Sequence, residues 1–385
     1  MTKQLLSAKF LTVKKQSILI AALWLIMQLV FLKQFGMVTT FEATKYLDQA
    51  RLLLQEGHYE SNNFTFYSTE ILLIAFCMKW SISLWFVVLL QCIANALSLY
   101  FFYKLVRYLT ASTQTAFLFS LFFLAMYYYH LYNVHLFTES LFFSLSILYA
   151  YLLFTTVRLS FFRFSLILFG LGLLSITRPT GILLIPPTLF YFIFQFGKKR
   201  ALALSSVVIL AGLAGFYFLL NTALNAGGEF DFLLPYIEEH IICGVPTATK
   251  VNNIQMAVNK NSVEGLWTII VNNGDLFSRL AKQRFFAFWG VQRSFYSTFH
   301  NAFLAIYFYP LYLLICLGAR KMFRYYTPQA IFITTYILLT TLTVVLSCDE
   351  WHNRFLFAIL PFLLLMATGL FIKKPNSYEY KNVGH

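Results

Sequence analysis

Apolar stretches of about 20 residues recur along this chain and alternate with short polar segments, and about 20 residues is the length that crosses a bilayer as an α-helix. Hydrophobic residues make up 59% of the sequence and charged residues 11%, whereas a soluble domain has roughly 45–50% and 25%. The sequence therefore predicts an all-α polytopic membrane protein and excludes an ordinary soluble globular domain.

Hydropathy predicts about ten transmembrane helices in a single membrane domain that covers residues 1–385. The first apolar run follows several lysines without a small-residue cleavage site, so we expect a retained helix and no cleaved signal peptide. An even number of spans leaves both termini on the same side of the membrane. The predicted spans are residues 16–33, 83–103, 115–130, 136–157, 162–177, 179–196, 201–222, 301–318, 328–347 and 354–372.

Charge distribution predicts the orientation of these spans. Basic clusters between spans fall on the side of the termini, which is therefore expected to be cytoplasmic. Of the 15 acidic residues only Glu379 lies on that side. We expect a multi-pass protein of a bacterial cytoplasmic membrane with its chemistry facing outward, and a lumen-facing site in an endoplasmic reticulum membrane is the topological equivalent. The net charge of +14 is spread over short loops, which argues against a nucleic-acid partner.

Two outer loops are long, residues 34–82 and residues 223–300. In the first, Tyr46, Ala50 and Leu53 recur at helical spacing and Gly57 follows, which predicts an amphipathic helix on the outer surface. A second apolar stretch in this loop, residues 71–78, is too short to span the membrane and is expected to be re-entrant or interfacial.

The segment that begins the amphipathic helix carries a recognisable pattern. Glu42 is followed by Tyr46 and Ala50, then by leucines and Gly57. This segment resembles the first outer loop of the GT-C superfamily of integral-membrane glycosyltransferases, in which an acidic residue, usually Asp, precedes Tyr and Ala at the same intervals. Glu42 is one methylene longer than the usual residue. Further segments agree with the family in order and side: Thr138–Phe142, Thr177–Gly181, and Arg354–Leu356 with Pro361.

The resemblance is best over residues 1–200 and 350–372 and points to the bacterial branch related to protein mannosyltransferases and lipid A aminoarabinose transferases. It implies a GT-C-like fold and an inverting transferase that moves a sugar from a polyprenyl-phosphate donor to a glycan, lipid or protein acceptor. The reaction would take place on the non-cytoplasmic face, with membrane lipids around the donor's tail. Residues 223–300, where such enzymes diverge, are expected to carry acceptor specificity.

A lipid phosphate is a good leaving group, so the enzyme mainly needs carboxylates to orient or deprotonate an acceptor hydroxyl and cations to stabilise the phosphate. Glu42 is the predicted base, with Asp48 as the alternative, and Glu139 is the predicted second carboxylate. Arg178 and Arg354 are the predicted phosphate clamps. Three more residues complete the predicted substrate-binding set: Tyr46, Glu70 and His352.

Structural roles for the same residues remain open at this point. Glu139 suits a helix N-terminus, and Arg178 suits the C-terminus of the preceding helix. Arg354 follows two acidic residues, Asp349 and Glu350, either of which would pair with it.

No cofactor is expected. Several outer-side histidines would compose a divalent metal site together with the acids, but no ligand spacing supports one. The cysteines show no CxxC spacing, so neither a metal site nor a disulfide framework is indicated. The histidines are His130, His135, His240 and His352, and the cysteines are Cys77, Cys92, Cys243, Cys316 and Cys348.

Two other functions fit the same architecture. A polymerase or ligase of polyprenyl-diphosphate-linked glycans would use the second outer loop, with the pair Glu239–His240 and the arginines Arg279, Arg284 and Arg293. A lipid or solute transporter would instead depend on polar residues in the spans, such as Gln91 and Asn95.

Overall fold

The computed structural model describes residues 12–196, 202–225, 234–245, 254–255 and 262–373, and these ranges are helical without a β-strand. Two isolated bridges, Val38 with His135 and Ile242 with Asp349, are the exceptions to helical pairing within these ranges. The basic cluster at residues 198–200, the first residue of the predicted span 201–222 and parts of the second outer loop lie outside the described residues.

Each predicted span contains at least one helix. Six helical segments are long and apolar enough to cross a membrane, so the prediction of a polytopic membrane protein is confirmed, while the number ten remains a prediction. These segments are α1 (Val13–Phe35), α4 (Trp85–Thr110), η3 (Pro179–Leu184) with α9 (Ile185–Phe196), α14 (Thr298–Tyr325), α15 (Thr327–Leu346), and η5 (Trp351–Asn353) with α16 (Arg354–Ala367) and η6 (Thr368–Phe371).

The other predicted spans hold shorter helices. The predicted straight span 115–130 is bent by 68° where α5 (Thr113–Ala125) meets α6 (Tyr127–Leu131), because Met126 has non-helical dihedral angles. This bent pair would make a seventh crossing. The remaining helices in predicted spans are α7 (Thr138–Phe154), α8 (Phe161–Thr177) and α10 (Leu202–Leu224).

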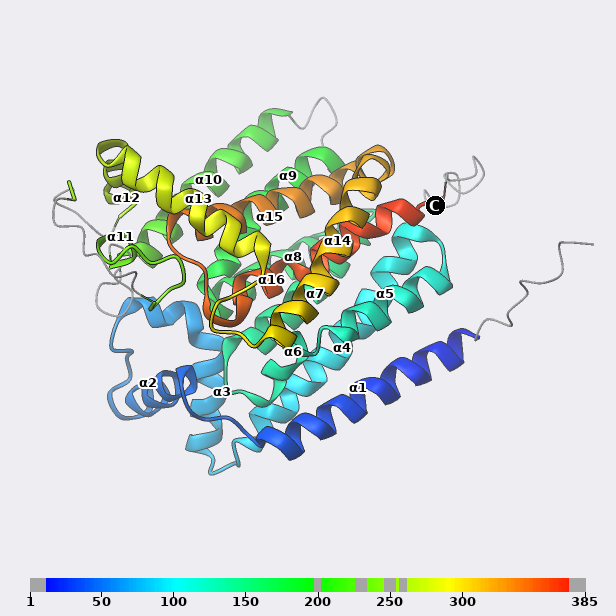
Figure 1. Ribbon diagram of the computed structural model, residues 1–385, viewed down its shortest axis with the longest axis horizontal. Coiled ribbons are helices and arrows are strands. Elements are labelled where there is room, and N and C mark those ends of the chain that lie inside the picture. Colours follow the sequence, from blue (N-terminus) through cyan, green and yellow to red (C-terminus); the bar gives the residue numbers. More distant parts are fainter. Residues whose placement is uncertain (1–11, 197–201, 226–233, 246–253, 256–261, 374–385) are drawn as a thin grey trace, which may run out of the picture.

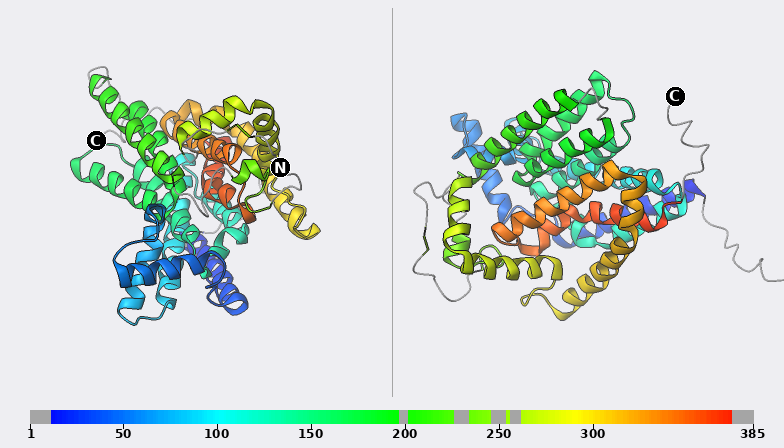
Figure 2. Two further views of the ribbon diagram at one scale, coloured as in Figure 1. Left: turned by 90° about the vertical axis from the view of Figure 1, so that its left-hand side faces the viewer. Right: turned by 90° about the horizontal axis from the view of Figure 1, so that it is seen from above.

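The long outer loops form helical structure at one end of the bundle (Figure 1). The start of α1 and the end of η6 lie at the opposite end, and the view from above in Figure 2 agrees. The first loop supplies α2 (Glu42–Glu56), η1 (Asn62–Tyr67) and α3 (Ser68–Lys79). The second loop supplies α11 (Leu234–Ile237), α12 (Val263–Asn272) and α13 (Gly274–Gly290).

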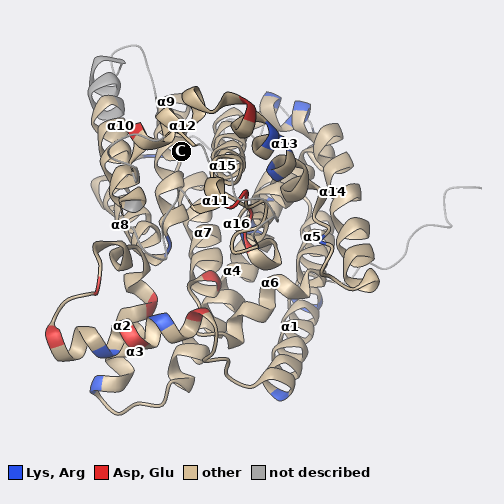
Figure 3. Ribbon diagram, turned by 60° about the vertical axis from the view of Figure 1, so that its left-hand side comes forward, with Lys and Arg blue, Asp and Glu red and all other residues tan. Residues whose placement is uncertain are grey.

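Helix α2 occupies the stretch predicted to be an amphipathic helix. It buries Ala43, Tyr46 and Ala50 on one face, where it packs against α3, and it ends at Gly57 with a φ of 77°. Helix α3 contains the apolar stretch 71–78 but has 12 residues, fewer than the roughly 20 that a crossing needs. The two helices therefore form a lobe, and Figure 3 shows acidic residues gathered there and at the facing end of the bundle.

Helix α16 is the centre of the fold. All of its residues from Arg354 to Ala367 are buried, and it packs against α7, α14 and α15. An apolar helix that is covered on every side carries its first residue, Arg354, to the end of the bundle where α2 begins.

The turn between α8 and η3 depends on a glycine. Pro179 starts η3, and a Cβ atom on Gly181 would lie 2.1 Å from the backbone oxygen of Leu174 in α8. Only a residue without a side chain allows this approach, which fixes the position of Arg178 between the two elements.

We expect Gly181→Ala to lower the free energy of unfolding by about 1–3 kcal/mol, because the added methyl group overpacks a backbone contact. Thermal unfolding in detergent would measure the effect. Gly172→Ala is the control, since a Cβ atom there meets nothing within 4 Å, and it should leave the melting temperature unchanged or slightly raised. Equal melting temperatures for the two variants would contradict this account of the turn.

Candidate active site

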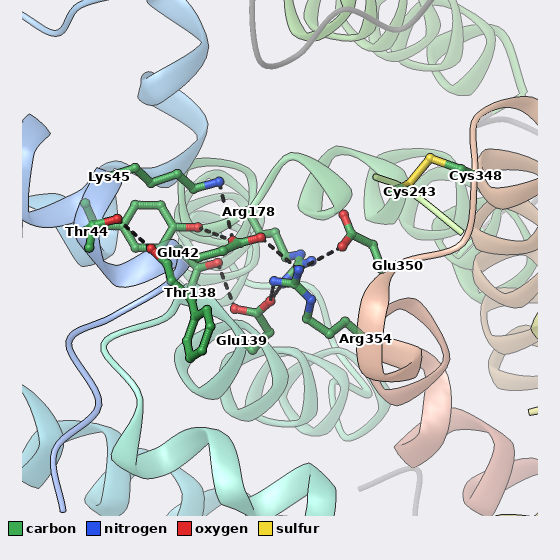
Figure 4. Close-up of polar contacts among 12 residues, drawn as sticks. Glu42, Thr44, Lys45, Thr138, Glu139, Arg178, Cys243, Cys348, Glu350 and Arg354 are labelled. Atoms are coloured by element: carbon green, nitrogen blue, oxygen red, sulfur yellow. Dashed lines mark hydrogen bonds and ion pairs between the residues drawn. A yellow bond between two sulfur atoms is a disulfide. The ribbon is translucent and has the colours of Figure 1, made fainter. Parts of the chain in front are cut away.

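Four of the predicted site residues meet in one ion-pair network around Arg354 (Figure 4). Its Nη1 donates to Glu139 Oε1 at 2.9 Å, and its Nη2 donates to Glu42 Oε1 at 2.8 Å. Arg178 Nη1 lies 2.5 Å from the same Glu139 oxygen. Arg354 Nη2 also lies 2.9 Å from Glu350 Oε2. Residues from four distant parts of the sequence thus form one cluster.

Helix ends place these groups. Glu42 is the first residue of α2 and Glu139 the second of α7, so both carboxylates lie at the positive end of a helix dipole. Arg178 follows the last turn of α8, where a cation is favourable. Arg354 is the exception, because it is a cation at the first position of α16. Its carboxylate partners offset this unfavourable placement.

A backbone bridge brings two of the helix starts together. The Val38 N–H donates to the Val134 carbonyl at 2.8 Å, and the Leu136 N–H donates to the Val38 carbonyl at 3.1 Å. Val38 precedes α2, whereas Val134 and Leu136 precede α7. The bridge therefore sets the distance between Glu42 and Glu139, which are 97 residues apart by number (139 − 42).

The network has a sealed part and an open part. The Glu139 side chain is 0% exposed, and those of Arg178 and Arg354 are 9% and 8% exposed. Glu42 and Glu350 are 29% and 24% exposed. A molecule arriving from solvent would therefore meet the latter two carboxylates first.

Glu42 is held in its ionised form. Burial opposes its ionisation, but the charges of Arg354 and Lys45 outweigh burial and lower its pKa to about 2. Lys45 Nζ lies 3.4 Å from Glu42 Oε2, and the Tyr46 hydroxyl donates to the same oxygen at 3.3 Å. Our sequence analysis missed Lys45, although its i,i+3 spacing from Glu42 on a predicted helix was a usable signal.

Three predicted residues lie outside the network: Asp48, His352 and Glu70. Asp48 is on the exposed side of α2, with its side chain 64% exposed, and pairs with Arg51 at 2.7 Å. His352 is exposed and has a φ of 59°, with its ring parallel to that of Tyr296 at a centroid distance of 6.2 Å. Neither Asp48 nor His352 contacts the carboxylates of the cluster in the described structure.

Glu70, predicted to contact substrate, is buried where α3 meets α4. Its side chain is fully buried, and Oε1 accepts a hydrogen bond from Gln91 Nε2 at 3.2 Å. The same nitrogen donates to the Phe137 carbonyl just before α7. Burial raises the pKa of Glu70 well above its usual range, which favours the neutral form of the carboxyl group. Glu70 Oε2 and Gln91 Oε1 have no hydrogen-bond partner in the described structure, and a proton on the carboxyl group adds a donor where only acceptors are left.

The structure corrects the expectation about cysteines. Cys243 and Cys348 form a disulfide with a Cα–Cα distance of 5.2 Å, although no disulfide framework was indicated. The two residues are 105 positions apart, and such a pairing depends on the fold and leaves no spacing pattern. The bond joins the second outer loop to the segment that carries Glu350.

The segment before α16 is anchored on both sides of Glu350. Asp349 is buried and paired with Arg293, which also donates to Asn353 Oδ1 at 2.6 Å. The Cys243 N–H donates to the Asp349 carbonyl at 2.8 Å. Of the two acids considered as partners of Arg354, Glu350 is therefore the one that pairs with it.

The arginines of the second loop have structural partners. Arg284 is fully buried and donates to the carbonyls of His240 and Pro235, both at 2.9 Å. Arg279 forms two hydrogen bonds of 2.8 Å with Glu239. These contacts hold α13 against the preceding loop.

No group of three or more His, Cys, Asp or Glu side chains within the described ranges is arranged to hold a metal ion. The histidines considered for such a site have other surroundings. His130, for example, is buried and bonded through Nδ1 to Asn95 Oδ1 at 3.0 Å.

Comparison with known proteins adds no assignment. No protein-family model matches the sequence, and no curated protein matches it significantly. The functional argument therefore depends on the residues themselves.

We expect Arg354→Gln to lower the free energy of unfolding by about 3–5 kcal/mol near neutral pH, because it leaves three carboxylates with the two cations Arg178 and Lys45 in a largely buried network. In the wild type, the stability that Glu42 contributes is complete above its unfolded-state pKa of 4.5 and is lost only as the pH falls through about 2. In the variant the pKa of Glu42 rises, so protonation of Glu42 at mildly acidic pH removes the uncompensated negative charge. The difference in unfolding free energy between wild type and variant should therefore shrink when thermal unfolding in detergent is repeated at mildly acidic pH.

Arg51→Gln is the control for this experiment. It breaks an exposed ion pair, whose loss is worth about 0–1 kcal/mol, and its effect should hardly depend on pH over the same range. A deficit of Arg354→Gln that is small, or that grows on acidification, would contradict the network as described.

Glu70→Gln should preserve stability, because an amide supplies the donor and acceptor of a neutral carboxylic acid. Glu70→Ala should cost about 2 kcal/mol or more, since it removes one of the two hydrogen-bond partners of Gln91 Nε2 and opens a cavity. Thermal unfolding of the two variants would measure both. If Glu70→Gln were as unstable as Glu70→Ala, an ionised Glu70 would be indicated.

Proposed function

We propose that this protein is a membrane glycosyltransferase that transfers a sugar from a polyprenyl-phosphate donor to a glycan, lipid or protein acceptor. The observation that carries the proposal is the convergence of Glu42, Glu139, Arg178 and Arg354 in one partly open network. The four residues were selected from separate motifs, and a shared site is what the GT-C resemblance implies. The all-helical membrane fold is compatible with it.

The arrangement suits a single displacement at the anomeric carbon. The bond between that carbon and the phosphate oxygen breaks, and its electron pair leaves with the phosphate. The acceptor oxygen forms the new bond and passes its proton to Glu42. Inversion follows, because the attacking and leaving oxygens lie on opposite sides of the carbon. The polyprenyl phosphate released would keep its charge next to Arg354 and Arg178.

The sealed carboxylate has a different role from the open one. Glu139 contacts both arginines and has no exposed surface, so it positions their guanidinium groups and cannot itself reach an acceptor in this conformation. Glu42 is exposed enough to contact an incoming hydroxyl, and Tyr46 and Lys45 hold its carboxylate in place through contacts with Oε2. Glu42 is therefore the better candidate for the base, and Asp48 is too far round α2.

The location of the network supports an outward-facing site. It lies at the end of the bundle that carries α2, α3 and α11, opposite the two ends of the described chain (Figure 1). If the basic loops face the cytoplasm, the site faces the exterior of a bacterial cytoplasmic membrane, and the donor's lipid tail lies between helices in the surrounding bilayer. No cofactor is required for this chemistry.

The contacts are less favourable to the other two functions. In a glycan ligase, Arg284 and Arg293 would have to bind a diphosphate, but both are occupied by backbone carbonyls or by a buried acid. For a transporter, Gln91 and Asn95 would have to line a pathway, but Gln91 is bonded to Glu70 and Asn95 accepts from Trp24 at 2.9 Å.

Glu42→Gln should reduce sugar transfer by about 100-fold or more, the usual contribution of a general base, while Asp48→Asn should retain most of the activity. The measurement is transfer from a labelled polyprenyl-phosphate sugar by purified protein in nanodiscs, with both variants checked for equal folding. Loss confined to Asp48→Asn would move the base to Asp48. Absence of turnover across a broad panel of sugar donors would overturn the proposed function.

A further inference from the structure

The carboxylate of Glu350 occupies a position on Arg354 that resembles that of a bound anion. Its Oε2 lies 2.9 Å from Arg354 Nη2, and this is the one ion pair that the side chain makes in the described structure. Carboxylate and phosphate oxygens bind a guanidinium group in the same way, through charge-assisted N–H···O bonds. The two kinds of oxygen therefore compete for the same nitrogen.

Charge balance requires one carboxylate to move out of the network when a phosphate binds there. The resting network has three carboxylates, Glu42, Glu139 and Glu350, and three cations, Lys45, Arg178 and Arg354. Among the described residues its charges therefore balance. A phosphate added to this set would leave uncompensated negative charge in a largely buried place, which is costly.

The contacts single out the acid that can leave. Glu139 is sealed and bound to both arginines. Glu42 is bound by Arg354, Lys45 and Tyr46 together. Glu350 makes one ion pair among the described residues and has a side chain that is 24% exposed, so fewer direct contacts hold it than hold the other two acids.

We propose that Glu350 occupies the subsite for the phosphate of a lipid monophosphate, and that its side chain turns away when the phosphate binds Arg354 and Arg178. This inference rests on the proposed function, because it assigns one part of the donor to one part of the site. It makes Glu350 a residue that determines donor affinity.

The movement is confined to the side chain of Glu350. The Cys243–Cys348 disulfide and the pair of Asp349 with Arg293 hold the backbone directly before it. Asn353, three residues later, is held by Arg293 and by the Val291 carbonyl, to which its Nδ2 donates at 3.1 Å. A rotation about the side-chain bonds of Glu350 leaves all of these contacts in place.

Displacement would also prepare the base. Arg354 Nη2 is shared by Glu350 and Glu42 in the resting state, and it would be shared with the phosphate after binding. The phosphate then draws positive charge away from Glu42 and adds negative charge nearby, which raises the pKa of Glu42 from about 2 towards the range in which a carboxylate accepts a proton.

The test is binding of a short-chain polyprenyl monophosphate without sugar to protein in nanodiscs of uncharged lipid. Glu350→Gln and Glu350→Ala should each bind it roughly fivefold tighter or more than the wild type, because a competing anion has been removed. Glu56→Gln is the matched control, since it removes the same charge from the exposed end of α2 and should leave the affinity unchanged. The corresponding uncharged polyprenol should bind equally to all four proteins.

Unchanged or weaker binding of the monophosphate to both Glu350 variants, at equal thermal stability, would overturn the inference. A result of this kind with normal sugar transfer leaves the proposed function standing. Conversely, tighter monophosphate binding by both variants without sugar transfer by the wild type would support the subsite and overturn the transferase. Failure of the wild type and of both variants to bind the monophosphate would overturn both.

Discussion

A buried guanidinium group at the start of a buried helix is the constraint on which the rest of the site depends. Arg354 is buried and lies at the helix end that repels cations, so its charge is stabilised only by carboxylates close to it. Three carboxylates approach it from α2, from α7 and from the segment before α16. The contacts that bring these segments together therefore serve to compensate one charge.

The stability of the fold does not by itself explain a network of this kind. Burying several charges in one place adds little net stability, because desolvation takes away much of what the attraction supplies. Buried charges of this kind are expected where a function requires charged groups that apolar residues cannot replace. The proposed function gives the two arginines such a role, which is to bind an anion in exchange for carboxylates that pair with them at rest.

Much of the fold followed from the sequence, because apolar length and helix-stop residues are local signals. The helix at 42–56, its end at Gly57 and the position of Arg178 at the end of α8 were all predictable from short stretches. The bend at Met126 was not, since the apolar run continues through it. The residues of the site were partly predictable. The acids and arginines chosen from the motifs converge, whereas Glu70 is buried away from them and His352 lies beside Tyr296.

The remaining gaps concern long-range partners. Nothing in the spacing of five cysteines indicates which two meet, and nothing near Asp349 indicates that Arg293 rather than Arg354 is its partner. Such pairings depend on how segments far apart in the chain are packed. The sequence limits which residues can pair, and the packing of the helices and loops determines which of them do.

The disulfide also turns part of the chain into a covalent ring. Cys243 and Cys348 enclose α12 to α15, including two long apolar helices. A single peptide-bond break anywhere inside the ring would leave the two fragments joined until the bond is reduced. A protein exposed to proteases at its outer surface would in this way keep its C-terminal helix, and with it Arg354, after a cut that would otherwise divide it in two.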